Sequence, residues 1–218
     1  MLDFSSKAPK IVCPSQSKGH IQVIFGPMFS GKTTELIRRV KKYQIANHKC
    51  MIVRYPHNSR NKERGVSEND VHDLNVVSMT TLSELKNETE NCSVVAVDEA
   101  QFFPDVVIVA EELANDGKIV IIAALDGTYL RQGFSNILQL IPLAESVLKL
   151  NSVCMICFED ASYTKRIGSE TEVEVIGGKD KYMAVCRSCH NSTSPLPQNS
   201  KHQSPCKVTT IQQATQIC

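Results

Sequence analysis

An octapeptide at residues 26–33 constrains the fold of this chain more than any other segment. It reads Gly-Pro-Met-Phe-Ser-Gly-Lys-Thr and matches the pattern G-x-x-x-x-G-K-[ST] at every fixed position. A short apolar run, residues 21–25, precedes it, and residues 33–47 carry apolar side chains at helical spacing. The alternative is a chance match in a glycine-containing loop, which explains neither the preceding strand nor the following helix. The octapeptide therefore predicts a phosphate-binding P-loop.

Each residue type in this loop has a chemical reason. Glycines let backbone N–H groups approach phosphate oxygens, and the following helix adds its positive N-terminal end. The Lys32 ammonium can reach the β- and γ-phosphates of ATP, and the Thr33 hydroxyl can ligate Mg²⁺. The residues predicted to contact ATP are Gly26, Pro27, Met28, Phe29, Ser30, Gly31, Lys32 and Thr33.

The rest of the first 150 residues alternates between strand and helix patterns. Three further apolar runs are predicted to be buried strands: residues 51–53, 94–98 and 119–125. Residues 105–116 predict a helix that Gly117 ends, and a further helix is expected to end near Leu150. This alternation predicts an α/β fold, a P-loop parallel sheet with helices on both faces.

The apolar run that begins at Val94 ends in two carboxylates, Asp98 and Glu99. Because strands of such sheets point their C-terminal ends at the ligand, Asp98 is placed to hold magnesium through water. The adjacent Glu99 could accept a proton from an attacking hydroxyl or water. Alternatively, both acids cap the helix that follows, since acids favour helix N-termini. Beside a P-loop, the pattern favours the magnesium and base roles.

Four of the nine cysteines form two matched pairs. Cys154 and Cys157, then Cys186 and Cys189, are each separated by two residues, and four thiolates of this kind suit tetrahedral zinc without an open position. The 28 residues between the pairs exceed the usual spacing, which an intervening loop would explain. The pairs predict a structural Zn²⁺ with His190 as a neighbour, against the alternative of two unrelated pairs of free thiols.

Composition limits the remaining classes. The formal net charge of +1 supplies no overall basic surface for nucleic acid, and no apolar run is long enough for a membrane span or signal peptide. We therefore expect an intracellular protein with no nucleic-acid or membrane partner. The expected organisation is a flexible arm (1–19), an ATP-binding domain (20–150), a zinc-binding domain (151–191) and a disordered tail (192–218). Residues 57–73 are polar and predict a loop.

The order of these features, with the residues between them, resembles the cytosolic, zinc-containing type of thymidine kinase. The likeness runs from about residue 20 to 191 and rests on five strings: GPMFSGKTTELIRRV, DEAQFFPDVV, AALDGTYLRQGF, IPLAESVLKL and YTKRIGSETEVEVIGGKDKY. The resemblance implies phosphorylation of the 5′-hydroxyl of thymidine or deoxyuridine by Mg-ATP, in nucleoside salvage for DNA synthesis. It also implies a cytoplasmic homotetramer restrained by dTTP.

The resemblance further assigns roles to individual residues. Glu99 matches the catalytic base. Residues matching contacts to ATP and magnesium beyond the P-loop are Asn58, Ser59, Arg60, Asp98, Glu99, Ala100 and Gln101. Residues matching nucleoside contacts are Met28, Phe102, Leu125, Tyr129, Thr164 and Tyr182, together with a lasso-like loop at Val173, Glu174, Val175, Ile176 and Gly177. From the residues alone, Phe102, Tyr129 and Tyr182 would equally suit core packing.

Two departures and two rival functions remain. Asn58 stands where the family has an aspartate, so a metal role there is in doubt, and Ala100 replaces a glycine. A nucleic-acid-driven ATPase is one rival, but such motors need a second ATPase-like domain and a basic bias that this chain lacks. A non-catalytic zinc module that only binds ATP is the other, but it would need no base at Glu99.

Overall fold

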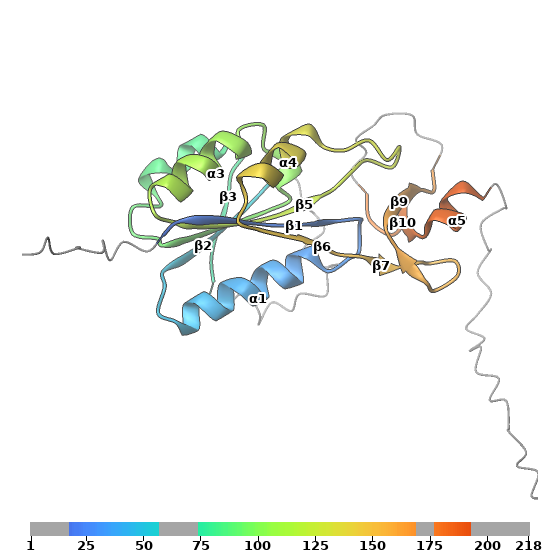
Figure 1. Ribbon diagram of the computed structural model, residues 1–218, viewed down its shortest axis with the longest axis horizontal. Coiled ribbons are helices and arrows are strands. Elements are labelled where there is room, and N and C mark those ends of the chain that lie inside the picture. Colours follow the sequence, from blue (N-terminus) through green and yellow to red (C-terminus); the bar gives the residue numbers. More distant parts are fainter. Residues whose placement is uncertain (1–17, 57–73, 169–176, 193–218) are drawn as a thin grey trace, which may run out of the picture.

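A six-stranded parallel sheet forms the centre of the protein in the computed structural model, which describes residues 18–56, 74–168 and 177–192 (Figure 1). Its strand order is β3-β2-β4-β5-β1-β6, and every neighbouring pair is parallel. The strands are β1 (His20–Gly26), β2 (Cys50–Arg54), β3 (Asn75–Ser78), β4 (Val94–Asp98), β5 (Ile119–Leu125) and β6 (Ser146–Lys149). The predicted parallel sheet is confirmed.

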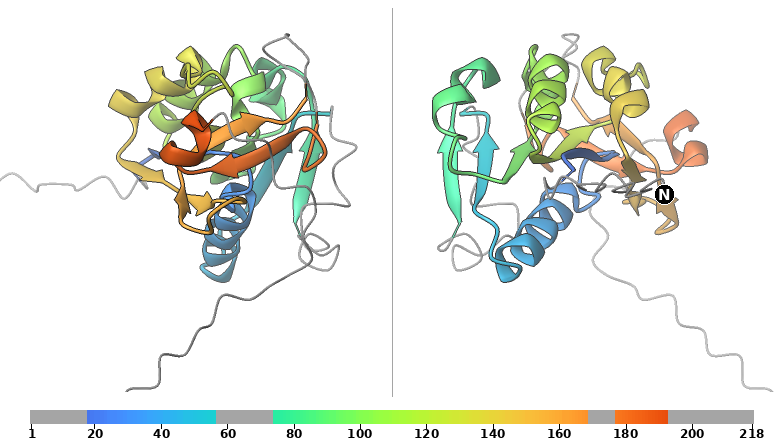
Figure 2. Two further views of the ribbon diagram at one scale, coloured as in Figure 1. Left: turned by 90° about the vertical axis from the view of Figure 1, so that its right-hand side faces the viewer. Right: turned by 60° about the vertical axis from the view of Figure 1, so that its left-hand side comes forward.

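Helices cover both faces of this sheet, as the alternating pattern predicts (Figures 1 and 2). Helix α1 (Lys32–Ile45) lies on one face, whereas α3 (Val106–Asn115) and α4 (Ser135–Leu140) lie on the other. Short 3₁₀ helices complete the connections: η2 (Leu82–Asn87), η3 (Ala100–Phe102) and η4 (Ile141–Leu143). Within the described ranges, no helix has both the length and the apolarity to cross a membrane.

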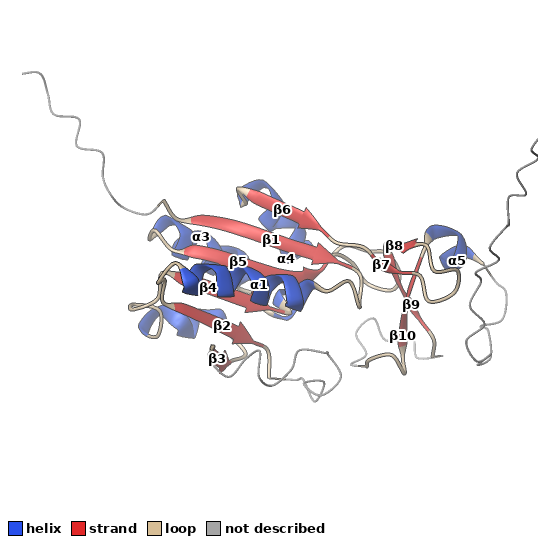
Figure 3. Cartoon of the chain, turned by 90° about the horizontal axis from the view of Figure 1, so that it is seen from below, coloured by secondary structure: helices blue, strands red, loops and turns tan. Residues whose placement is uncertain are grey.

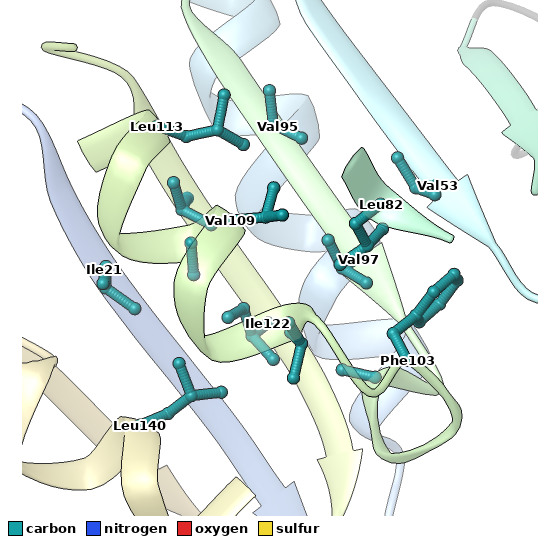
Figure 4. Packing of buried hydrophobic residues seen from close by; sticks show 14 of the residues in the cluster. Ile21, Val53, Leu82, Val95, Val97, Phe103, Val109, Leu113, Ile122 and Leu140 are labelled. Atoms are coloured by element: carbon teal, nitrogen blue, oxygen red, sulfur yellow. The ribbon is translucent and has the colours of Figure 1, made fainter. Parts of the chain in front are cut away.

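The central strands are apolar because both of their faces are covered. Every residue of β4 is buried, so its two sets of alternating side chains enter two different cores. Val95 and Val97 pack toward α3, where Phe103 is the largest fully buried side chain (Figure 4). Val94 and Ala96 pack toward α1. This two-sided burial fixes the C-terminal end of β4, where the two carboxylates lie.

The prediction of a helix that ends near Leu150 is wrong. Helix α4 ends at Leu140, a single 3₁₀ turn containing Pro142 follows, and residues 146–149 form the edge strand β6 beside β1. Proline cannot continue the helical hydrogen bonding, and an edge strand with one face toward solvent lacks the apolar run of a central strand. The opposite edge strand, β3, was missed for the same reason, since only two of its four residues are even half-buried.

A small lobe extends from the C-terminal edge of the sheet (Figures 1 and 3). It contains two antiparallel pairs, β7 (Ser152–Val153) with β8 (Asp160–Ala161) and β9 (Tyr163–Arg166) with β10 (Tyr182–Val185), followed by α5 (Arg187–Asn191). Among its described residues, the lobe has one hydrophobic core cluster of five buried residues: Cys154, Ala161, Met183, Ala184 and Val185. So small a core needs a further source of stability.

Candidate active site

The P-loop turns away from the C-terminal end of β1 over a very close backbone contact. A Cβ atom at Gly26 would lie 2.3 Å from the carbonyl oxygen of Leu150, so only glycine fits there. Further along, Phe29 and Gly31 adopt left-handed conformations (φ 64° and 81°), and Gly31 is the N-cap of α1. A non-glycine residue in this region costs about 1–3 kcal/mol, and such strain is typical of functional loops.

Two polar side chains of the loop fold onto its own backbone. The Lys32 ammonium donates to the Pro27 carbonyl at 2.6 Å and to the Ser30 hydroxyl at 3.4 Å. The Ser30 hydroxyl donates to the same carbonyl at 2.9 Å. The loop is thus curled around its lysine at the N-terminus of α1, the end of a helix that favours an anion.

The acid at the end of β4 meets the first turn of α1. Asp98 is only 2% exposed, and the Thr33 hydroxyl donates to its two oxygens at 3.1 and 3.2 Å. The backbone N–H of Glu99 donates to Asp98 Oδ1 at 3.1 Å. Strand β5 lies between β4, which carries Asp98, and β1, which leads into the P-loop. Thr33 therefore reaches Asp98 only because α1 passes across β5 toward β4. A hydroxyl and a carboxylate, both suited to magnesium, are therefore brought together.

Arg54 also reaches this site, and the sequence reasoning missed it. Its Nε lies 3.8 Å from Asp98 Oδ2, and the two residues are register partners at the ends of β2 and β4. That nitrogen is buried and forms no hydrogen bond to any part of the chain that the structure describes. The signal was available in the sequence, because the apolar run of β2 ends in a charge just as that of β4 does.

Glu99 occupies an unusual backbone conformation directly after β4. Its φ of 58° is left-handed, and the 3₁₀ helix η3 begins at the next residue. The Gln101 amide donates to Glu99 Oε2 at 2.5 Å, and Ala100 is completely buried beneath. The Glu99 N–H contacts Asp98, so the two acids lie next to one another with different partners. The arrangement presents one carboxylate to Thr33 and the other to Gln101.

Two hydrogen bonds join the P-loop to the small lobe. Thr164 of β9 accepts the backbone N–H of Met28 on its Oγ1 at 3.0 Å. The Ser152 hydroxyl of β7 donates to the Phe29 carbonyl at 3.1 Å. Because of these contacts, Met28 and Thr164, predicted to line the nucleoside site, lie side by side. The lobe is thereby attached to the phosphate-binding backbone itself.

The aromatic candidates fall into two groups. Phe102 is half-buried and its ring lies 5.3 Å from that of Tyr55, measured between centroids. Tyr129 and Tyr182 share Arg166, whose guanidinium carbon lies 3.9 Å from the Tyr129 ring centroid. Arg166 Nη2 donates to the Tyr182 hydroxyl at 2.7 Å. Arg166 is 9% exposed and connects the β5–α4 loop to the hairpin of β9 and β10, a link that sequence reasoning did not find.

Of the remaining candidate residues, two lie within the described ranges and the others do not. Leu125, at the end of β5, is half-buried, and its backbone N–H donates to Gln101 Oε1 at 3.0 Å. Gly177 precedes a turn in which Gly178 donates its N–H to Asp180 Oδ1 at 2.8 Å. Seven predicted residues lie outside the described ranges: Asn58, Ser59, Arg60, Val173, Glu174, Val175 and Ile176.

The four paired cysteines form one cluster in the small lobe. The sulfurs of Cys154, Cys157, Cys186 and Cys189 all lie within 4.8 Å of one another. Cys157 Sγ and Cys186 Sγ are 3.6 Å apart. A tetrahedron with Zn–S bonds of about 2.3 Å has sulfurs about 3.8 Å apart, so this cluster fits zinc. The described cysteines are all free thiols, and His190 is not part of the cluster.

The electrostatics of the cluster also favour a cation. Burial opposes ionisation of the Cys154 thiol, but N–H groups of Cys157, Cys186 and Ile156 outweigh it and lower its pKa to about 6. Burial and the neighbouring thiols raise the pKa of Cys189 to about 12. Four adjacent thiolates repel one another unless a central cation compensates their charge. The cluster can therefore hold a divalent metal with no position left for a substrate.

Several known proteins are similar to this chain in sequence. A family model described as "Thymidine kinase" matches residues 19–190. The cytosolic thymidine kinase of Gallus gallus is 50% identical over 190 residues, covering 87% of this chain and 85% of the relative. The thymidine kinase of Monkeypox virus is 53% identical over 172 residues, covering 79% and 97%. The cytosolic thymidine kinase of Cricetulus griseus is 49% identical over 195 residues, covering 88% and 83%.

Proposed function

The chain belongs to the thymidine kinase family, and on that premise we propose that it phosphorylates the 5′-hydroxyl of thymidine and of deoxyuridine. Mg-ATP is the phosphate donor, and the products of the thymidine reaction are dTMP and ADP. The observation that carries the proposal is the meeting of Thr33, Asp98 and Glu99 at the C-terminal edge of the sheet, next to the P-loop. The product supplies DNA synthesis by salvage of the nucleoside.

ATP binds through the P-loop, with Lys32 at the β- and γ-phosphates. Thr33 and Asp98 hold the magnesium ion, and their direct contact at 3.1 Å supports this pairing. When bound, magnesium neutralises charge on the phosphate oxygens. Asn58, Ser59 and Arg60 are further proposed contacts of ATP, with Arg60 toward phosphate. The burial of Asp98 supports its role, because a low-dielectric site strengthens attraction to a cation.

Glu99 acts as the general base. The 5′-oxygen of the nucleoside forms a bond to the γ-phosphorus while the bond from that phosphorus to the β–γ bridging oxygen breaks. The hydroxyl proton passes to the Glu99 carboxylate and ADP leaves. The left-handed backbone of Glu99 supports this role, since strain at a carboxylate beside a phosphate loop is typical of a catalytic position.

The nucleoside lies between the sheet edge and the small lobe. Phe102 stacks on the pyrimidine, Tyr129 and Tyr182 enclose the nucleoside, and the loop at residues 173–177 reads the base edge with backbone groups. Met28, Leu125 and Thr164 line the position of the thymine methyl group. The hydrogen bond between the Met28 N–H and Thr164 Oγ1 supports this grouping, because it keeps the small lobe in contact with the P-loop.

A structural zinc ion on the four cysteines stabilises the small lobe. The compact sulfur cluster and the five-residue core of the lobe support this proposal. Residues 20–150 then form the ATP-binding domain, and residues 151–191 form the zinc domain that carries the nucleoside loop.

Cellular location, assembly and regulation follow from the same family. We propose a cytoplasmic homotetramer that the end product dTTP inhibits. Two relatives carry "cytosolic" in their names, which supports the location. Inhibition by dTTP predicts that thymidine turnover falls as dTTP is added, whereas dGTP at the same concentration has no such effect.

The test is ADP release with Mg-ATP against thymidine, deoxyuridine, deoxycytidine, a purine deoxynucleoside and single-stranded DNA. Turnover limited to thymidine and deoxyuridine is the expected result, and ADP release stimulated only by DNA would refute the proposal. The variant Glu99→Gln should retain ATP binding and lose turnover by roughly 10²–10⁴-fold, the range for loss of a general base. Near-normal turnover in that variant would remove Glu99 from the mechanism.

A further inference from the structure

The two faces of strand β9 make contacts with different parts of the molecule. Successive side chains of a strand point to opposite faces, and in β9 Thr164 and Arg166 are buried while Tyr163 and Lys165 are half-buried. The Lys165 ammonium donates to three backbone carbonyls of the segment 189–192, each at 3.2 Å. One face of the strand is therefore occupied by the end of the lobe that holds the cysteines.

The buried face of β9 contacts the ATP-binding domain at two points. Thr164 accepts the Met28 N–H of the P-loop at 3.0 Å. Two residues further on, the guanidinium carbon of Arg166 lies over the ring of Tyr129, 3.9 Å from its centroid, and Tyr129 belongs to the β5–α4 loop. A cation over an aromatic face is attracted by the ring, more strongly where water is excluded, and Arg166 is only 9% exposed.

Arg166 holds a second tyrosine within its own lobe. Tyr182 of β10 is its register partner, and Arg166 Nη2 donates to the Tyr182 hydroxyl at 2.7 Å. The guanidinium carbon lies 5.2 Å from the centroid of the Tyr182 ring. A guanidinium is planar and rigid, and all of its polar hydrogens are donors, so the Tyr182 oxygen is the acceptor. One rigid group thus sets the position of two aromatic side chains that lie on either side of the boundary between lobe and ATP-binding domain.

We propose that Arg166 is a positioning residue for the nucleoside, which holds Tyr129 and Tyr182 in place across this boundary. The inference rests on the proposed function, in which these two tyrosines enclose the nucleoside. Arg166 acts through the two rings and not on the substrate. The proposed phosphate contacts of Lys32 and Thr33 lie on a different element, α1, so loss of Arg166 should weaken nucleoside binding and leave ATP binding unchanged.

The physical reason is the conformational entropy of the two rings. Aromatic side chains that come from different elements lose freedom when they close around a ligand, and that loss weakens binding. Arg166 orders both side chains as the protein folds, before the nucleoside arrives. Its contribution therefore belongs to nucleoside affinity and not to the phosphate-transfer step.

The direct test is Arg166→Met, which keeps an unbranched side chain and removes both the charge and the hydrogen bond. We expect the KM for thymidine to rise about 10-fold, while the KM for ATP stays within about two-fold, because only the tyrosines lose their support. Calorimetric titration with thymidine should show a loss of affinity of the same size. The matched control is Arg187→Met, since Arg187 is exposed and its guanidinium carbon lies 5.0 Å from the Tyr163 ring centroid, on the other face of β9. This control should keep both KM values.

Thermal unfolding and zinc content show whether each variant is folded. If Arg166→Met is not, Arg166→Lys keeps the positive charge, but its compact ammonium lacks the planar fork that reaches both tyrosines. That variant should raise the KM for thymidine in the same direction. A folded variant at position 166 with a normal KM for thymidine would overturn the proposal. An equal rise in both KM values would do so too, because it would show a general structural effect.

A double-mutant cycle tests whether Arg166 acts through Tyr182. Tyr182→Phe removes only the hydroxyl that accepts the hydrogen bond, so Arg166→Met combined with Tyr182→Phe should raise the KM for thymidine by less than the product of the single effects. Effects that multiply would overturn the proposal and leave the proposed function intact. A native protein that does not phosphorylate thymidine would overturn both.

Discussion

Asp98→Asn removes one buried charge at the sheet edge and keeps the size of the side chain. In the native protein, Arg54 Nε lies 3.8 Å from Asp98 Oδ2, and the Arg54 side chain is 20% exposed. Coulomb attraction at that distance is about 4 kcal/mol for an effective dielectric constant near 20. Desolvation of both groups offsets part of this energy, and water reaches the outer part of Arg54. We therefore expect Asp98→Asn to lower the free energy of unfolding by about 2 kcal/mol.

The same change should also weaken magnesium-dependent ATP binding, and the loss of binding free energy should exceed the loss of unfolding free energy. The asparagine amide still accepts from Thr33, but it carries no charge for the cation. At about 2–4 °C per kcal/mol, the melting temperature should fall by roughly 4–8 °C. Titration of magnesium at fixed ATP, followed by calorimetry, measures the second effect. The control is Asp116→Asn, an exposed acid at the opposite edge of the sheet, which should change neither quantity.

The reasoning would be refuted by an Asp98→Asn protein that binds Mg-ATP like the native chain. A variant with lost magnesium dependence and an unchanged melting temperature would instead show that Arg54 contributes no net stability to the metal-free protein. The two measurements thus test the metal role and the ion pair separately.

Three other outcomes are expected. Elemental analysis should find about one zinc per chain. Because the lobe has so small a core, Cys157→Ser should lose the metal and thymidine turnover while Mg-ATP binding persists. A zinc-free protein that remains active would contradict this prediction. Hydrogen bonds first from Arg38 and then from Arg39 lower the pKa of Glu35 to about 2 from 4.5, so its stabilisation is complete above about pH 4.5 and is lost toward pH 2. Glu35→Gln should therefore cost about 1 kcal/mol at pH 7 after discounting for solvent screening, and nothing near pH 2, in urea unfolding at both pH values. Phe103→Ala should cost about 3–5 kcal/mol, because its ring is completely buried; a loss below about 1 kcal/mol in the same assay would contradict the packing.

Signals contained within one short segment were predictable from the sequence. The P-loop pattern, the buried strands β4 and β5 and the stop of α3 at Gly117 each depend on residues close together in the chain. The spacing of the cysteine pairs likewise predicted a metal cluster, and the structure brings all four sulfurs together. In each case the local pattern alone restricts what the backbone can do.

The edge strands were not predictable in this way. Three of the four residues 146–149 are exposed and the segment follows a proline turn, so its pattern carries neither helical nor strand periodicity. Their conformation is set by hydrogen bonds to β1, more than a hundred residues earlier in the chain. A strand that gains its order from a distant partner leaves little trace in its own composition.

The sequence by itself determined which residue types carry the chemistry: a lysine and a threonine in a glycine loop, two acids after a strand, and four thiols. Only the tertiary structure decided which of them touch. Arg54 reaches Asp98, Gln101 joins Glu99 to Leu125, and Thr164 holds Met28. Local patterns follow from steric and hydrophobic preferences of neighbouring residues. Contacts between distant side chains depend on how whole elements cross and pack, which only the folded chain specifies.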